Sequence, residues 1–596
     1  MTEQNPPISS EIKFHMVRKI ECHKIVGLAG LELLEHEAKY LEFHRIAGVI
    51  LFGTNVESFS QVRDLVESVQ ERMSGDGLVP IVAVDHEGDF VGELKKLIGI
   101  PPSAMAIAAT GDPELAYDVA LETGQAMAKL GVNAVFAPVA DLFLDRSSPV
   151  TGIRTFGRDP EIVGEFVAST IRGFREAGVL TCVKHFPGHG GSGGDSHETL
   201  PVINKTMEEL QAVDYVPFRR AIEAGTDMVM TAHVAYTLGD EAAAKIPASF
   251  DPKFLQNALR AELGFEGVII TDALEMEGAR VHSREKYGGL MGGAERSLVA
   301  GSDILLYAAP IPVRIEGTGD ENPMIAVEVM QTIIETLHKV VDPSRVAQKL
   351  EKAAENHEGV RNLLKILDAS EARIVKMRKS ASQLNTARTP KPGGNVISLG
   401  DFASTPPIYK TVAERSIVLL RDPESFIPLG KDSVCLLLPV EYVPGQSLKR
   451  QDLDVFLGGL CRMFPSWKFV RPVVGFDRDE NDAVRPVFAP PSVSTAPVDG
   501  EDSHPVRSPE LPDDALIVPV FSSRGVPPDP FLDRLAEFVE DRHVPFVIVT
   551  AWPVTSWIPE SVGCLVTLGA SGPVAAAAGA VLAGETAARE APEGIV

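Results

Sequence analysis

Short apolar runs alternate with amphipathic stretches through the first 310 residues of the chain. Most of the runs are rich in Val, Ile and Leu, which is typical of strands buried on both faces. The eight runs are Ile25–Leu28, Gly48–Phe52, Ile81–Asp85, Ala134–Pro138, Leu180–Lys184, Met228–Ala232, Gly267–Thr271 and Asp303–Tyr307. Helical patterns lie between most of them, among them Glu114–Leu130, Glu161–Ala177, Met207–Ala224 and Pro252–Leu263. Eight βα units in one region predict an α/β fold, a TIM-like (β/α)8 barrel.

The pattern changes beyond the barrel. Three helical patterns are expected on the barrel's flank: Ile325–Val340, Ser344–Asn356 and Val360–Arg378. A segment rich in Pro, Gly and Thr, Thr386–Ser398, then indicates a linker. We therefore predict a barrel domain with flanking helices over residues 1–385, a linker over 386–400, and a second domain over 401–596.

Alternation of strands and helices resumes in the second domain, which predicts a smaller, open α/β/α sandwich. A segment rich in Pro, Asp and Ser, Val474–Asp514, is expected to be a mobile excursion. Strands are predicted at Ser416–Leu420, Val434–Pro439, Trp467–Val470, Ala515–Val520, Pro545–Thr550 and Gly563–Thr567. Helices are predicted at Leu448–Met463, Asp529–Val539 and Val574–Ala583.

Composition narrows the range of partners. The 596 residues include 56 Lys and Arg against 82 Asp and Glu, a net charge of −26. Such acidity argues against nucleic acid and anionic membranes, which select basic surfaces. The five cysteines form no CxxC pair, so neither a disulfide framework nor a structural zinc site is expected. The polar N-terminus carries no signal-peptide pattern, and we expect a soluble, cytoplasmic protein.

Ionisable residues gather where the predicted strands end, which is where barrel enzymes place catalytic groups. Asp85, His86 and Glu87 follow the third strand, and Asp272 follows the seventh. The fifth strand ends in Lys184-His185, and His233 follows the sixth. A single strand-end Asp is more often a turn or helix cap than a catalyst. Four strands with the same feature indicate an active site at this rim.

The segment Lys184–Pro201 (KHFPGHGGSGGDSHETLP) is the strongest signal in the chain. Its Gly and Pro residues favour an extended loop, in which Asp195 and His197 point the same way. A carboxylate beside an imidazole fixes its tautomer and raises its pKa, which suits an acid–base dyad. A salt bridge within the loop is the simpler interpretation. A metal site built from His185, His189 and His197 is another.

The pattern KHFPGHGxxxxDSHxxLP resembles the β-N-acetylhexosaminidase branch of glycoside hydrolase family 3. Further motifs are similar to those of the family, in the same order, over roughly residues 20–310. They are Ile50-Leu51-Phe52 with Asn55, Val84–Gly88 (VDHEG), Asn133 with Phe136–Asp141 (FAPVAD), Arg154–Gly157 with Asp159-Pro160, Val229–Tyr236 (VMTAHVAY) and Thr271–Ala279 (TDALEMEGA). The segment Val412–Arg421 resembles, more weakly, the start of the second domain in two-domain members.

The resemblance implies a retaining glycosidase that uses no cofactor or metal. Asp272 would be the nucleophile, and His197, paired with Asp195, would protonate the leaving oxygen and then activate water. The positions that hold the sugar in the family match Asp85, Arg154, Lys184 and His185, while His233 and Met276 would line the pocket. The activity implied is removal of terminal N-acetylglucosamine from a small carbohydrate, with muropeptides of cell-wall recycling as the expected source. The second domain would be structural or would form a homodimer contact.

Asp89 and Glu93 stand where the family usually continues G-R-V-x-R after DHEG, so both arginines are absent. This added negative charge weakens the expectation of a strongly anionic substrate. Three neighbouring activities remain open: a phosphorylase with phosphate as acceptor, a β-glucosidase or β-xylosidase, and a sugar-binding relative without turnover. A metal-dependent barrel hydrolase with His185, His189, His233 and Asp272 as ligands is disfavoured. Such barrels usually need HxH after the first strand, which here ends in Gly27-Leu28-Ala29-Gly30.

Overall fold

The computed structural model describes residues 22–89, 91–145, 148, 151–191, 200–240, 245–310, 357–386 and 406–416. Beyond these it describes the strands of a second sheet and Ala578. The predicted helices Ile325–Val340 and Ser344–Asn356 lie outside the described residues, as does the linker after Thr386. The helical patterns Leu448–Met463 and Asp529–Val539 also lie outside them, as does the rest of Val574–Ala583.

The eight predicted barrel strands are all present and parallel. Their order around the sheet is β11-β9-β7-β6-β3-β2-β1-β12, and a parallel bridge from Ile270 to Ile304 joins the two edges. The predicted (β/α)8 barrel is therefore confirmed. The strands are β1 (Lys24–Gly27), β2 (Gly48–Leu51), β3 (Ile81–Val84), β6 (Ala134–Val135), β7 (Leu180–Phe186), β9 (Met228–Thr231), β11 (Val268–Thr271) and β12 (Leu305–Pro310).

Helices surround the barrel, and the sequence marks where two of the longest begin. Asp112 and Asp159 each cap a helix by accepting backbone N–H groups, and a proline follows each of them as the first helical residue. The helices are α2 (Glu35–Phe43), α3 (Phe59–Met73), α4 (Lys95–Ile98), α5 (Ala104–Ala109), α6 (Pro113–Lys129), α7 (Pro160–Glu176), α8 (Met207–Glu209), α9 (Tyr215–Glu223), α10 (Glu277–Tyr287) and α11 (Leu290–Ala300). Two stretches, Leu210–Asp214 and Lys253–Glu262, wind as π-helix.

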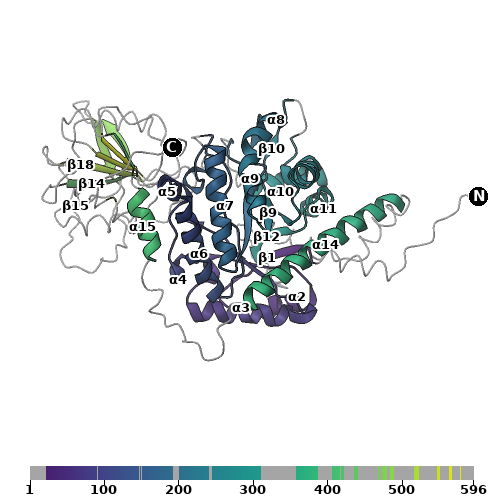
Figure 1. The fold of residues 1–596 in the computed structure, drawn as a ribbon. Coiled ribbons are helices and arrows are strands. Elements are labelled where there is room, and N and C mark those ends of the chain that lie inside the picture. The colour runs from purple at the N-terminus through teal and green to yellow at the C-terminus, as the bar shows by residue number, and fades with distance from the viewer. Residues whose placement is uncertain are drawn as a thin grey trace, which may run out of the picture.

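The long helix α14 (His357–Thr386) lies across the N-terminal end of the barrel (Figure 1). Its Ile374, Met377 and Ala381 pack into the apolar cluster that fills the barrel interior. Arg373 also pairs with the fully buried Asp303, which lies just before β12. The third predicted helix therefore closes the base of the barrel, whereas the sequence suggested a place on its flank.

The second sheet is mixed, with the order β13-β20-β19-β18-β14-β16-β17 and β15 paired to β14. All six predicted strands are present. The antiparallel pair β16–β17 was not predicted, and it occupies the start of Val474–Asp514, so the expected excursion is wrong for these strands. The strands are β13 (Val418–Arg421), β14 (Cys435–Val440), β15 (Lys468–Phe469), β16 (Val473–Arg478), β17 (Val484–Phe488), β18 (Leu516–Phe521), β19 (Val547–Thr550) and β20 (Gly563–Val566).

Candidate active site

The end of β3 leads directly into a small hairpin at the C-terminal rim of the barrel. Asp85 follows β3, and β4 (His86–Gly88) pairs with the antiparallel β5 (Val91–Gly92). The amide of Glu93 donates to the carbonyl of Asp85 over 3.1 Å, which ties the far end of the hairpin to its start. The imidazole of His86 points away from solvent, and burial lowers its pKa to about 4, so the ring is neutral at pH 7.

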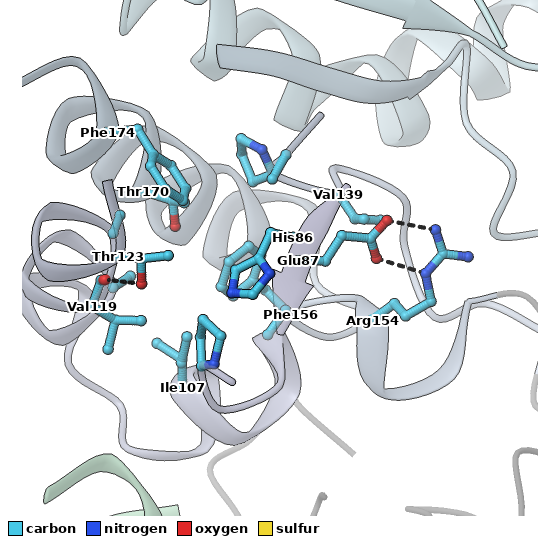
Figure 2. A pocket seen from close by; sticks show the side chains of 16 residues that line it. His86, Glu87, Ile107, Val119, Thr123, Val139, Arg154, Phe156, Thr170 and Phe174 are labelled. Atoms are coloured by element: carbon cyan, nitrogen blue, oxygen red, sulfur yellow. Dashed lines mark hydrogen bonds and ion pairs between the residues drawn. The ribbon is translucent and has the colours of Figure 1, made fainter. Parts of the chain in front are cut away.

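Glu87 in this hairpin joins three of the predicted sugar-binding residues into one cluster. It accepts two hydrogen bonds from Arg154, at 2.7 and 2.8 Å, which Figure 2 shows as parallel dashed lines. Lys184 Nζ lies 2.6 Å from Glu87 Oε1 and also 2.6 Å from Asp85 Oδ1. Asp85, Arg154 and Lys184 are therefore brought together, with Glu87 at the centre.

The charges in this cluster stabilise one another. Burial works to raise the pKa of Glu87, but the positive charges of Arg154 and Lys184 outweigh it and hold that pKa well below its usual range. Burial works to lower the pKa values of Arg154 and Lys184, yet the neighbouring carboxylates raise both. Two cations thus balance two carboxylates, Asp85 and Glu87. Such a group presents both hydrogen-bond donors and acceptors, which suits the hydroxyls of an uncharged sugar.

His185 is held by Asp141, which the sequence motif contains but to which we assigned no role. Asp141 is fully buried, and its Oδ2 lies 2.6 Å from His185 Nδ1. Its Oδ1 accepts the amide of His189 over 2.6 Å. Burial works to raise the pKa of Asp141, but the two histidines and their hydrogen bonds lower it. In the neutral imidazole this contact places the proton on Nδ1 and leaves Nε2 as the acceptor.

Asp272 follows β11 at the same rim and is partly exposed. Its own amide donates to the carbonyl of Thr231 over 3.1 Å, and its Oδ1 accepts the amide of Ala273 over 2.8 Å. The carboxylate therefore contacts a backbone amide at the end of a barrel strand, where barrel enzymes place catalytic groups.

His233 and Met276 both lie near Asp272. His233 is held by hydrogen bonds, whereas Met276 makes apolar contacts. His233 is buried, with Nδ1 2.8 Å from Ser249 Oγ and Nε2 3.0 Å from the carbonyl of Ala273. A sugar contact through either ring nitrogen would have to break one of these bonds, so His233 positions the residue that follows Asp272. Met276 packs against the apolar interior of the barrel.

Asp195 and His197 lie outside the described residues, but the structure describes both flanks of their segment. Before it, the carbonyl of Gly190 accepts the amide of Asp145 over 3.0 Å. A Cβ on Gly190 would lie 1.7 Å from the carbonyl oxygen of Leu142, so the close backbone contact requires glycine. After it, β8 (Val202–Ile203) pairs with β10 (Ala235–Tyr236), just beyond β9. Both flanks are thus fixed at the C-terminal rim of the barrel.

Two buried carboxyl groups at the rim were missed as site residues. Glu87 was named among the ionisable residues that follow the third strand, two residues after Asp85, but no role at the sugar was predicted for it. Glu275 follows Asp272 by three residues, and its Oε1 accepts the amide of Ala309 over 2.6 Å. Its Oε2 is buried and has no hydrogen-bond partner in the described part of the chain. Burial raises the pKa of Glu275 to about 7, and the charge of Asp272 acts in the same direction.

Asp89 and Glu93, the two acidic residues that replace the family's usual residues after DHEG, both form hydrogen bonds with neighbouring backbone groups. Asp89 is buried at φ 44°, a conformation that glycine, the family's residue here, adopts without strain. Its amide donates to the carbonyl of Pro101 over 2.8 Å. Glu93 Oε2 accepts the amide of Gly53, just beyond β2, over 2.5 Å. These acids therefore shape the rim through backbone contacts.

The described residues contain no group of three or more His, Cys, Asp and Glu side chains that could hold a metal ion. The four candidate ligands of the metal-dependent alternative, His185, His189, His233 and Asp272, all lie within that part of the chain. Over the same ranges, no helix is long and apolar enough to cross a membrane.

Comparison with known proteins settles the family. Residues 16–355 match the model of the glycosyl hydrolase family 3 N terminal domain. The chain belongs to glycosyl hydrolase family 3. This match covers more than half of the sequence and includes every strand of the barrel, so the chain is a glycoside hydrolase.

Two relatives of this family 3 member carry the name Beta-hexosaminidase. A Beta-hexosaminidase from Tolumonas auensis is 39% identical over 288 residues, which cover 47% of this chain and 81% of the relative. One from Stenotrophomonas maltophilia is 36% identical over 292 residues, covering 48% of this chain and 83% of the relative.

Two solved structures share the fold over nearly the whole chain. A family 3 beta-N-acetylglucosaminidase from Paenibacillus sp. is 23% identical with a TM-score of 0.72, covering 96% of this chain and 97% of that one. The Beta-glucoside phosphorylase BglX is 18% identical with a TM-score of 0.66, covering 97% of this chain and 95% of that one. At these identities, the likeness concerns the fold alone.

Proposed function

We propose that this glycoside hydrolase is a retaining exo-β-N-acetylglucosaminidase. The observation that carries the proposal is the shared rim of one barrel, where the backbone-held carboxylate of Asp272 accompanies the charge-balanced cluster of Asp85, Glu87, Arg154 and Lys184. The two relatives named Beta-hexosaminidase, which match the barrel region at 39% and 36% identity, support the choice of sugar. Muropeptides of cell-wall recycling in the cytoplasm are the natural source that we propose.

In the first step, an Asp272 oxygen forms a bond to the anomeric carbon while the bond to the leaving oxygen breaks. The imidazolium of His197 gives its proton to that oxygen, with Asp195 holding the ring. In the second step, His197 takes a proton from water, whose oxygen attacks the anomeric carbon and releases Asp272. Two inversions retain the configuration. Asp85, Lys184, Arg154 and His185 hold the sugar hydroxyls through both steps.

We propose water, in preference to phosphate, as the acceptor. Both cations of the rim cluster are already paired, Arg154 with Glu87 and Lys184 with Asp85 and Glu87. No net positive charge remains in this cluster to bind a phosphate dianion.

The test is turnover of aryl β-N-acetylglucosaminides and aryl β-glucosides, with product analysis in the presence and absence of phosphate. We expect release of free N-acetylglucosamine at a rate that does not depend on phosphate. Accumulation of a sugar 1-phosphate only with phosphate present would show a phosphorylase. Preference for the β-glucoside would overturn the choice of sugar.

A further inference from the structure

Helix α15 (Pro407–Ser416) follows the predicted linker, yet its buried face lies against the barrel (Figure 1). Tyr409 and Val412 are 1% and 0% exposed and belong to the same apolar cluster as α5 and the first part of α6. At the end of the helix, Arg415 lies 3.1 Å from Asp112, the N-cap of α6. The start of the C-terminal region is therefore anchored on the barrel at two points.

The hydroxyl of Tyr409 makes a specific contact with helix α6. Its oxygen lies 2.6 Å from Thr123 Oγ1, and both side chains are buried. Thr123 donates its own hydroxyl proton to the carbonyl of Val119 over 2.6 Å. Because a hydroxyl has one proton, Tyr409 must be the donor to Thr123. Burial raises the pKa of Tyr409, which keeps that donor protonated.

Thr123 stands at the wall of a cavity of about 30 Å³ behind the β4–β5 hairpin. Figure 2 shows His86 and Glu87 on the hairpin side of this cavity, with Thr123, Val119 and Ile107 facing them from the helices. Where a cavity replaces direct packing, the hairpin has fewer neighbours to hold it. The position of the hairpin then depends more on the residues that line the cavity.

The hairpin is supported directly by the segment that leads into α5. The carbonyl of Pro101 accepts the amide of Asp89 over 2.8 Å. A Cβ on Gly88 would lie 2.4 Å from the carbonyl oxygen of Pro102, so the two backbones are in direct contact. Helix α15 packs on α5, which begins two residues later. Helix α15 therefore contacts both α5, whose leading segment meets the hairpin, and α6, which lines the cavity opposite the hairpin.

We propose that Tyr409 is a positioning residue for sugar binding, through which the C-terminal region holds the hairpin that carries Glu87 against Arg154 and Lys184. The proposal rests on the proposed function, because it assigns the sugar contacts to that cluster. Tyr409 acts on the sugar-binding side and leaves Asp272, on β11, untouched. Its loss weakens binding of substrate and of free sugar by the same factor and leaves kcat nearly unchanged.

The experiment is a double-mutant cycle between Tyr409→Phe and Glu87→Gln in the full-length protein, with kinetics on an aryl β-N-acetylglucosaminide. We expect Tyr409→Phe to raise both KM and the inhibition constant of N-acetylglucosamine about three- to tenfold, with kcat within about twofold. In the Glu87→Gln background, the same substitution should raise KM by less than about twofold. Equal factors in both backgrounds, or an unchanged KM, would overturn the proposal.

Control variants separate positioning from general stability. Thr123→Val removes the other end of the hydrogen bond and should reproduce the KM of Tyr409→Phe, while Thr123→Ser keeps the hydroxyl and should restore it. Thr411→Val removes an exposed hydroxyl from the same helix and should leave KM unchanged. If Thr411→Val raises KM as Tyr409→Phe does, the effect is one of stability and the proposal is wrong. A wild-type protein that prefers an aryl β-glucoside contradicts the proposed function instead, and the same cycle is then read on that substrate.

Discussion

Glu87 receives two hydrogen bonds from the guanidinium of Arg154, from Nε to Oε2 over 2.7 Å and from Nη2 to Oε1 over 2.8 Å. This fork, together with Lys184 at 2.6 Å, makes Glu87 the point through which the cations of the rim are oriented. Arg154 and Lys184, which were predicted to contact the sugar, are thus positioned by Glu87, for which no sugar contact was predicted.

Glu87→Gln should raise KM about tenfold or more and lower the free energy of unfolding by about 3–5 kcal/mol, because two buried cations lose their shared partner. Steady-state kinetics and thermal denaturation measure the two effects. An exposed pair supplies the control: Arg172→Gln breaks a contact with Glu114 at 2.9 Å and should change neither value appreciably. A Glu87→Gln enzyme with the KM of the wild type would show that Arg154 and Lys184 do not depend on Glu87 for their orientation.

Asp141→Asn should lower kcat/KM by about a hundredfold, because the amide no longer fixes the proton of His185 on Nδ1 and His185 loses its orientation. The comparison variant is Asp145→Asn, at a nearby aspartate whose backbone amide donates to the carbonyl of Gly190. Kinetics at several pH values would test the assignment. It fails if both variants lose activity equally.

The titration of Glu275 predicts how stability depends on pH. Its pKa rises from 4.5 to about 7 on folding, mainly through burial. The folded state therefore holds the proton of Glu275 more tightly than the unfolded state does. The stabilisation that comes from this group is fully present below pH 4.5 and is lost as the pH rises through about 7. The loss should reach about 3 kcal/mol at alkaline pH.

Glu275→Gln keeps the neutral form at every pH and should flatten this part of the profile. Melting temperatures between pH 5 and 9 provide the measurement, with Glu208→Gln as an exposed control that follows the wild type. Parallel profiles for Glu275→Gln and the wild type would mean that Glu275 is already ionised in the folded protein.

Asp303 should matter for stability and not for catalysis. It is fully buried at the base of the barrel and contacts Arg260 at 2.5 Å and Arg373 of α14 at 2.7 Å. Asp303→Asn leaves two cations without a carboxylate and should cost about 3–5 kcal/mol of unfolding free energy. At a temperature where the variant is folded, its kcat should equal that of the wild type. A large loss of kcat in folded protein would contradict this division between the base and the rim.

Much of the fold could be predicted because its elements are local in the sequence. Strands buried on both faces are continuous apolar runs, and Asp-Pro pairs at Asp112 and Asp159 mark helix starts. The π-helix Lys253–Glu262 could not be distinguished from an α-helix, since its buried residues Phe254, Leu255, Ala258 and Leu259 suit either winding. The strands β16 and β17 were missed because Pro and Asp dominate the segment that contains them.

Only part of the candidate site could be predicted from the sequence. Residue types at strand ends indicated Asp85, Lys184 and Asp272, because parallel strands bring their ends to one rim. Whether His233 faces a sugar or the carbonyl of Ala273 depends on a rotamer that no local pattern encodes. The contact between Tyr409 and Thr123 joins residues 286 positions apart, and only the folded chain brings them together.

The central claim, that Asp272 forms a bond to the sugar, is tested most directly by trapping. A fluorinated N-acetylglucosaminyl donor that forms the glycosyl-enzyme quickly and hydrolyses it slowly should add the mass of one sugar to the protein. We predict that peptide mass spectrometry finds this addition on Asp272 and that Asp272→Ala gains no mass. A sugar attached to another residue, or donor turnover with no attached sugar, would contradict the account.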